Sequence, residues 1–275
     1  MPTYITAAEV RNACGAPTSL ISNTTIEGFI NIVEKEVERF LNTKFSPTLK
    51  IDIIDGTARD NFFVTKKPLL NVRALKSNDT TITPRYLHIY KESGKILLGE
   101  DAELGQFISK ARDIWCKYYF GMVEDTSTTT ASTGAVTYGT VKTVAVTSST
   151  GFTALDWVEI TGMDGYKEVA QISSIPGTTS IIVDELIFNH ESGSIVTKVS
   201  IPDYIKRIMI LEGCIAVAIN AIGGTYTFNT SYNIGELAVT KGEPYPQWRE
   251  VILRSINERD MRMAKIKPRF HMAVG

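Results

Sequence analysis

The segment that most restricts the fold runs from residue 205 to 222 and is apolar on nearly every side of a helix. Pro202 suits the first turn of this helix, and Gly223 with Gly224 predicts its end. Such a helix must be covered on several sides, so we expect it at the centre of a core or against a neighbouring subunit. Its uncharged part is too short to span a bilayer of about 30 Å, which indicates a soluble protein. The charged residues that interrupt it are Lys206, Arg207 and Glu212.

Two sequences near the amino terminus match the capping box, in which a threonine begins a helix and a glutamate three residues later reaches back to it. They are Thr6 with Glu9 and Thr24 with Glu27. We therefore predict a short helix over about 7–13 that ends at Gly15, and a longer helix over about 25–42. The apolar residues of the longer helix follow a spacing of three and four, which predicts one buried face.

Between residues 49 and 121 the apolar residues alternate with polar ones, which is typical of strands. The segment 92–95 predicts a hairpin turn, because Gly94 accepts the positive φ that such turns require. The predicted strands are 51–53, 62–65, 72–75, 86–90, 95–98 and 114–120.

The composition changes at residues 126–133, TSTTTAST, where seven of eight residues are Thr or Ser. This composition is typical of a flexible polar linker. Short strands separated by glycine turns follow it and predict a small closed barrel or sandwich, in a segment with seven acidic and three basic residues. These strands are 141–147, 157–161, 169–175, 180–188 and 195–199.

The helical beginning and end of the chain enclose this β region, so residues 1–125 are expected to need residues 200–275 to complete a core. The predicted fold class is α+β. It has a mainly helical core with a β-hairpin region, formed by residues 1–125 and 200–275. A small all-β barrel or sandwich, residues 126–199, is predicted to be inserted into that core.

The residue types that carry catalysis or bind metals form no recognisable motif. The histidines His88, His190 and His271 stand apart from any cysteine or carboxylate at metal-ligand spacing, and are interpreted as surface residues. Asp52 with Asp55 is interpreted as a solvated strand edge rather than a glycosidase pair. No phosphate-binding loop or nucleophile elbow is present. We therefore predict a protein that is not an enzyme and has no cofactor.

The carboxy-terminal segment is the first of two candidate interaction segments. A last helix is predicted from about Pro246, and residues 246–275 carry seven basic and three acidic residues. Aromatic residues and arginine often anchor interfaces, so this segment is a candidate docking arm. Its candidate residues are Tyr245, Trp248, Arg249, Arg259, Arg262, Lys265, Lys267, Arg269 and Phe270.

The second candidate segment is 224–243, which lacks a regular pattern although a compact domain rarely carries so long a loop without a use. We interpret it as an inter-subunit or channel loop, with candidate residues Tyr226, Phe228, Tyr232 and Lys241. The net charge of the whole chain is -1, so no broad basic surface is expected to hold DNA tightly.

The order of these segments resembles the head-to-tail adaptor, or connector, proteins of tailed bacteriophages. The resemblance begins with YITAAEVR at residues 4–11 and the helix that ends EVERFL at 36–41. It continues with the strand near 113–121, the helix that begins IPDYIK at 201–206, and a final helix and tail. It covers about 5–125 and 200–265, whereas 126–199 departs from the minimal family pattern and resembles small β modules added to virion proteins.

The resemblance implies a structural virion protein, made in the host cytoplasm, that forms a ring, usually dodecameric, at the head–tail junction. The implied partners are further copies of the chain, the portal protein and a tail completion, stopper or tail protein, with no membrane. Packaged double-stranded DNA would pass through the ring without sequence-specific binding. The carboxy-terminal segment would dock on the portal.

Two other functions are compatible with the sequence. A tail-associated receptor- or carbohydrate-binding module would show exposed aromatic residues clustered on the barrel, and Trp157 with Tyr166 is the visible pair. A hydrolase with an unrecognised site would show turnover on a broad panel of substrates.

Overall fold

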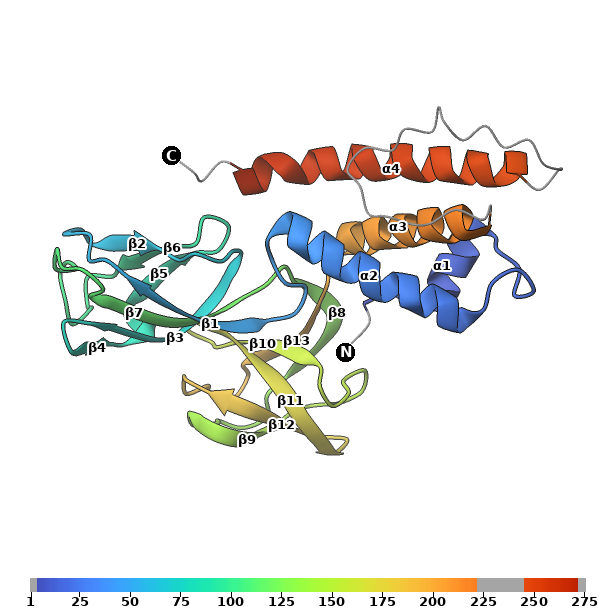
Figure 1. The fold of residues 1–275 in the computed structure, drawn as a ribbon. Helices are drawn as coiled ribbons and strands as arrows, with labels where there is room; N and C mark the ends of the chain where they lie inside the picture. The colour runs from blue at the N-terminus through green and yellow to red at the C-terminus, as the bar shows by residue number, and fades with distance from the viewer. Residues whose placement is uncertain (1–3, 222–244, 272–275) are drawn as a thin grey trace. The chain divides into compact units, whose positions relative to one another are not determined.

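The computed structural model describes residues 4–221 and 245–271, which form two compact units (Figure 1). The helical unit combines Met1–Asn42 with Pro202–Gly275, and the β unit is Thr43–Ile201. Strand accounts for 36% of the structure and helix for 29%, in three antiparallel sheets and four helices among the described residues. The prediction of a mainly helical core was therefore wrong, because the short strands between residues 43 and 123 build two sheets and not a hairpin region beside helices.

The first helix of the helical unit, α1 (Ala7–Cys14), has the predicted capping box. Thr6 Oγ1 accepts a hydrogen bond from Glu9 N, and the Glu9 side chain accepts one from Thr6 N. Gly15 ends the helix in the left-handed conformation, with φ 68°. Helix α2 (Asn23–Leu41) begins differently from the prediction, because Ser22 and not Thr24 is its capping residue.

Helix α3 (Asp203–Ala221) lies at the centre of the helical unit and contacts α1, α2 and α4 (Tyr245–His271). A Cβ atom at Gly213 would lie 2.9 Å from the Val10 side chain, so the glycine allows α1 to approach α3 closely. Three helices of the same chain therefore cover the apolar surface of α3. The helix was predicted to lie either at the centre of a core or against a neighbouring subunit, and the structure has it at the centre of a core. No helix in the described part of the chain is long and apolar enough to span a membrane.

The β unit begins with two small sheets that pack on a shared core. This core contains Phe62 and Phe107, whose rings meet edge-on with centroids 5.1 Å apart, and buried aliphatic residues from both sheets. The four-stranded sheet has the order β1 (Thr48–Ile54), β7 (Ile114–Phe120), β3 (Leu69–Ser77), β4 (Thr80–Ile82). The three-stranded sheet has the order β2 (Asn61–Phe63), β6 (Lys95–Leu98), β5 (Leu87–Tyr90), and the short helix η1 (Pro84–Tyr86) precedes β5.

The remaining strands form a six-stranded antiparallel sheet that curls around its own apolar core. Its first and last strands are joined beyond their ends by a bridge between Ser132 and Val146. Thr133 N also donates to Ala145 O at 2.9 Å, which closes the sheet on this side. The order is β8 (Glu124–Ala131), β13 (Ile195–Ser200), β10 (Trp157–Thr161), β11 (Lys167–Gly177), β12 (Ser180–Leu186), β9 (Gly139–Ala145).

The Thr- and Ser-rich segment predicted to be a linker is mostly strand β8, so that prediction was wrong. Thr129 and Thr130 pair with Thr197 and Val196 of β13, and Thr130 is buried. Threonine is β-branched and suits a strand, but its polarity conceals the alternation that marks strands in a sequence.

The boundaries of the compact units lie at residues 42/43 and 201/202, whereas the sequence predicts domain boundaries at 125/126 and 199/200. Leu70 and Tyr119 of the four-stranded sheet pack against Val169 of the six-stranded sheet. An insertion over 126–199 that folds on its own stays a prediction.

Candidate interaction surfaces

The predicted docking residues of α4 differ in their exposure. Arg249 and Lys265 are exposed, whereas Trp248 is half-buried. Arg262 is half-buried and binds Glu258. The Glu258 carboxylate also lies 3.0 Å from Nε of Arg207 on α3. The hydrogen bond from Arg207 and the further bond from Arg262 outweigh burial and lower the pKa of Glu258. Arg262 therefore belongs to a charged cluster that links α4 to α3.

Arg259 is buried and does not reach the surface of the helical unit. Its guanidinium binds Glu212 of α3 at 2.6 Å and Asp260 at 2.7 Å. Burial alone would lower the pKa of Arg259, but the Glu212 carboxylate raises it above its ordinary value. The structure therefore places this residue where it fixes α4 on α3, and not where a partner could contact it directly.

Several predicted residues lie outside what the structure describes. The loop candidates Tyr226, Phe228, Tyr232 and Lys241 are outside the described residues. Tyr245, Lys267, Arg269 and Phe270 lie within the bounds of α4, but their side chains are outside the described part. Their roles stay predictions.

Strand β1 exposes its aliphatic residues and buries a charged one. Leu49, Ile51 and Ile53 point to the outer face of the sheet and are 44%, 49% and 51% exposed. Asp52 points inward, is buried, and accepts a hydrogen bond from the Tyr118 hydroxyl at 2.7 Å. The interpretation of Asp52 as a solvated residue was therefore wrong.

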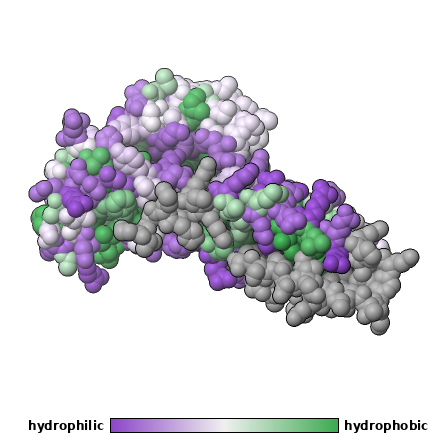
Figure 2. Space-filling view, turned by 90° about the horizontal axis from the view of Figure 1, so that it is seen from above, coloured by the Kyte–Doolittle hydropathy of each residue, from purple (hydrophilic) through white to green (hydrophobic). Residues whose placement is uncertain are grey.

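The hydrogen bonds of Asp52 fix which side chains of β1 face inward and which face outward. Thr65 N donates to Asp52 at 2.7 Å, so a shift of one residue in register would break these buried bonds as well as expose the carboxylate. The register pairs Ile51 with Lys117 and Ile53 with Trp115 of β7. On the face drawn in Figure 2, the hydrophobic areas are small and lie among hydrophilic residues. Strand β1 is an edge strand, and we name its row of three exposed aliphatic residues the β1 stripe.

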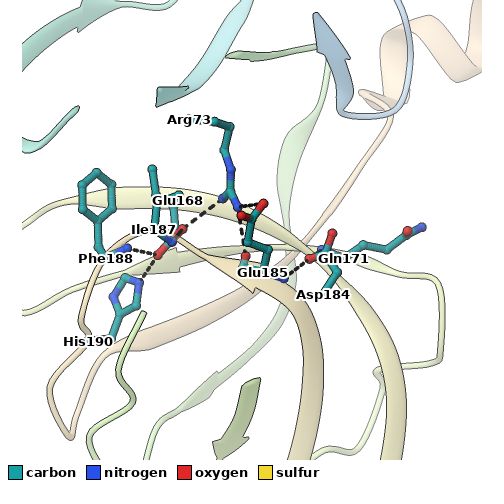
Figure 3. Close-up of polar contacts among 8 residues, drawn as sticks. All are labelled: Arg73, Glu168, Gln171, Asp184, Glu185, Ile187, Phe188 and His190. Carbon is teal, nitrogen blue, oxygen red and sulfur yellow. Dashed lines mark hydrogen bonds and ion pairs between the residues drawn. The ribbon is translucent and has the colours of Figure 1, made fainter. Parts of the chain in front are cut away.

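A buried charged network joins the four-stranded sheet to the six-stranded sheet (Figure 3). Arg73 of β3 binds Glu168 of β11 at 3.2 Å and Glu185 of β12 at 2.6 Å. On its other side, Glu168 meets His190 Nε2 at 2.6 Å. Glu168 also accepts hydrogen bonds from the backbone of Ile187 and Phe188. The interpretation of His190 as a surface residue was wrong, since it is buried in this network.

Two further ion pairs, Lys91 with Glu159 and Arg85 with Asp164, join the six-stranded sheet and its β10–β11 hairpin to the residues on either side of β5. Glu159 binds Lys167 at 2.5 Å and Lys91 at 3.2 Å. Although burial raises the pKa of Glu159, the bonds and charges of these two lysines outweigh it and lower the pKa below its ordinary value. Arg85 binds Asp164 at 2.7 Å. Basic residues that precede position 125 thus neutralise much of the acidic charge predicted for the barrel segment.

The aromatic pair that would suit a carbohydrate-binding module does not form an exposed cluster. Trp157 packs edge-on against Tyr119, with centroids 5.3 Å apart. The Arg85 guanidinium lies over the Tyr166 ring at 4.9 Å, and Tyr166 also contacts Phe188. Both rings therefore contribute to contacts within the β unit.

The described residues include no group of three or more His, Cys, Asp or Glu side chains that could hold a metal ion. No model of a known protein family matches the chain, and no curated protein sequence matches it either. The candidate functional features are therefore the β1 stripe, the exposed basic residues of α4 and the surfaces near the charged network.

Proposed function

We propose that the chain is a non-catalytic structural subunit that assembles with copies of itself into a ring. The ring would lie between the portal and the tail or stopper of a tailed bacteriophage. The observation that carries the proposal is the orientation of the side chains of β1. Leu49, Ile51 and Ile53 are exposed, whereas Asp52 is buried and accepts a hydrogen bond from Tyr118. Burying the β1 stripe would stabilise an assembly by removing apolar surface from water.

A neighbouring copy is the occupant that best fits the β1 stripe. The stripe lies on an edge strand, where both the apolar face and the open edge can be covered by another chain. In a ring each copy uses one surface toward the next copy and a different surface toward the previous one. The β1 stripe would be one of these two surfaces.

The location at the head–tail junction rests on the resemblance to adaptor proteins. The exposed Arg249 and Lys265 of α4 supply a polar surface for the portal in that arrangement. The net charge of -1 suits a channel through which DNA passes without being held, since tight phosphate binding needs many clustered cations.

The β1 stripe is tested with Ile51→Glu, which would place a carboxylate in the contact between copies. Ile195→Glu is the matched control, because Ile195 is 44% exposed on strand β13 of the six-stranded sheet, away from β1. Particles that carry each variant are purified, and the number of copies per particle is measured by quantitative mass spectrometry. We expect Ile51→Glu to lose incorporation while its melting temperature stays near that of Ile195→Glu. Equal incorporation of both variants would contradict the proposed contact.

The location is tested by electron microscopy of tailed particles that contain the chain. We expect ring density between head and tail that disappears in particles lacking the chain. Density at the tail tip, or fibre-like density around the tail, would contradict the adaptor function and favour a receptor-binding role.

A further inference from the structure

Two of the three cysteines meet in the helical unit, although they come from opposite ends of the chain. Cys14 is the last residue of α1, and Cys214 lies on α3, which packs against α1. Both thiols are free and buried. The Cys214 sulfur lies 3.6 Å from Val10 O, which belongs to the turn of α1 that ends at Cys14, and the Cys214 thiol also hydrogen-bonds to Cys14.

The backbones of α1 and α3 are as close together as a disulfide requires. A Cβ atom at Gly213 would lie 3.7 Å from the Cβ atom of Val10. The two Cβ atoms of a disulfide are about 3.5–4.5 Å apart. Gly213 directly precedes Cys214, and Val10 lies one helical turn before Cys14, so the two cysteines stand next to this close contact.

Charged side chains hold α1 in this position. Lys206 of α3 binds Glu9 of α1 at 2.7 Å. Arg11 donates to Ala16 O at 3.1 Å and so fixes the chain that follows Cys14. Because the two sulfurs are held near each other, the effective concentration of one at the other is high.

Cys14 has the reactivity that thiol–disulfide exchange requires. The hydrogen bond from Cys214 outweighs burial and lowers the pKa of Cys14 to about 7, and exchange is fastest for a thiol whose pKa is near the ambient pH. Exposed Gly15 follows Cys14, so an oxidant can reach the sulfur when this last helical turn opens. Cys116 differs, because it lies in the core of the β unit and burial raises the pKa of its thiol.

We propose that Cys14 and Cys214 form a redox modification site, at which a small disulfide oxidant such as oxidised glutathione produces a reversible cross-link between α1 and α3. The Cys14 thiolate attacks one sulfur of the oxidant, forms a mixed disulfide and releases one glutathione. Cys214 then loses its proton and attacks the Cys14 sulfur, which releases the second glutathione. The protein loses two hydrogen atoms, and the oxidant becomes two molecules of reduced glutathione.

The cross-link joins the amino-terminal part of the helical unit to its carboxy-terminal part, with the whole β unit between them in the sequence. A bond that closes so long a loop restricts the unfolded chain and stabilises the fold. The site goes beyond the proposed ring, because neither cysteine lies on β1 and the cross-link forms within one chain.

The test incubates the full-length protein with oxidised glutathione at neutral pH and then blocks the remaining thiols with N-ethylmaleimide in urea. Mass spectrometry of tryptic peptides should show one cross-link between Cys14 and Cys214 and a blocked Cys116, and dithiothreitol should reverse the cross-link. Oxidation should raise the urea midpoint that far-ultraviolet circular dichroism measures. In Cys14→Ala the midpoint should be the same under oxidising and reducing conditions, whereas Cys116→Ala should behave as the wild type does.

A variant that keeps both cysteines separates geometry from chemistry. Gly213→Ala would place a Cβ atom 2.9 Å from the Val10 side chain and so push α3 away from α1. It should slow cross-linking about tenfold or more, because small displacements of reacting groups lower their effective concentration steeply. Gly28→Ala on α2 is the matched control, because a Cβ atom there meets no other atom within 4 Å. It should cross-link at the wild-type rate.

Four results would overturn the site. Cross-linking that occurs only in urea would show that the two sulfurs do not meet in the folded protein. Glutathione attached to Cys14 without a cross-link, or a disulfide between two chains, would show that Cys214 is not the partner. Oxidation of Cys116 as fast as that of Cys14 would mean that the reaction follows global unfolding. A wild-type rate in Gly213→Ala would refute the argument from the close contact.

Discussion

Replacing Arg73 with methionine should destabilise the β unit by about 3 kcal/mol, the lower end of what breaking a buried ion pair costs. The side chains of Arg73 and Glu168 are 3% and 0% exposed, so the variant leaves the Glu168 carboxylate buried without its cation. The lower end applies because Glu168 keeps the hydrogen bonds from Ile187 N at 2.9 Å and Phe188 N at 3.2 Å. The loss of the Glu185 ion pair adds little to this destabilisation, because the Glu185 side chain is 43% exposed and water can solvate its carboxylate.

The free energy of unfolding is measured by urea titration in a Trp248→Phe background, so that the fluorescence reports on Trp115 and Trp157 in the β unit. Arg85→Met is the matched control, because its pair with Asp164 also joins residues on either side of position 125 but has side chains 48% and 38% exposed. We expect the control to cost less than about 1 kcal/mol.

The double variant Arg73→Met with Glu168→Gln removes both charges of the buried pair. It should be more stable than the sum of the single variants predicts, because neither charge is then left buried alone. If Arg73→Met costs no more than Arg85→Met, the buried network does not hold the two sheets together and the reasoning fails.

Two other measurements test the electrostatics. The lowered pKa of Glu159 means that its ion pairs stabilise the fold above the ordinary carboxyl pKa of 4.5 and that this stability is lost as the pH falls through the folded-state pKa. Glu159→Gln should therefore be less stable than the wild type at neutral pH, and urea titrations should show the difference shrinking in acid; a constant difference would refute this. A hydrogen bond from the Cys214 thiol lowers the pKa of Cys14 to about 7, so Cys214→Ala should raise that pKa. Thiolate absorbance as a function of pH measures it, and an unchanged titration would show that the thiols do not interact.

Local signals predicted the ends of elements where the partners are close in sequence. The capping box of Thr6 and Glu9 and the left-handed Gly15 lie within ten residues, and both are confirmed. The second helix shows the limit of such signals. Ser22 and Thr24 are both good capping residues, and the structure has Ser22 as the cap, whose hydroxyl accepts from Thr25 N.

The fold class was not predictable from local pattern because short strands become sheets only through distant pairing. Strand β8 has a polar composition, yet its pairing with β13, which lies some seventy residues later, makes it part of the barrel. The four-stranded sheet likewise joins β1 to β7, and both bury residues against a second sheet. Helical segments are recognised more easily from one stretch of sequence, which led to the prediction of a mainly helical core.

The candidate sites likewise include features that the sequence predicted and features that depend on distant contacts. The sequence identified the basic carboxy-terminal helix, but it could not show that Arg259 is buried against Glu212 of another helix. No spacing signal marks His190, since its burial depends on strands from other parts of the chain.

The sequence by itself determined the extent of the first helix and of the strands at 95–98 and 114–120, because those signals act over a few residues. Only the tertiary structure decided that Arg73 meets Glu168, 95 positions away, and that β1 faces its aliphatic residues outward. The physical reason is that burial and pairing depend on which surfaces meet in space, and residues far apart in the chain carry no mutual signal in a single sequence.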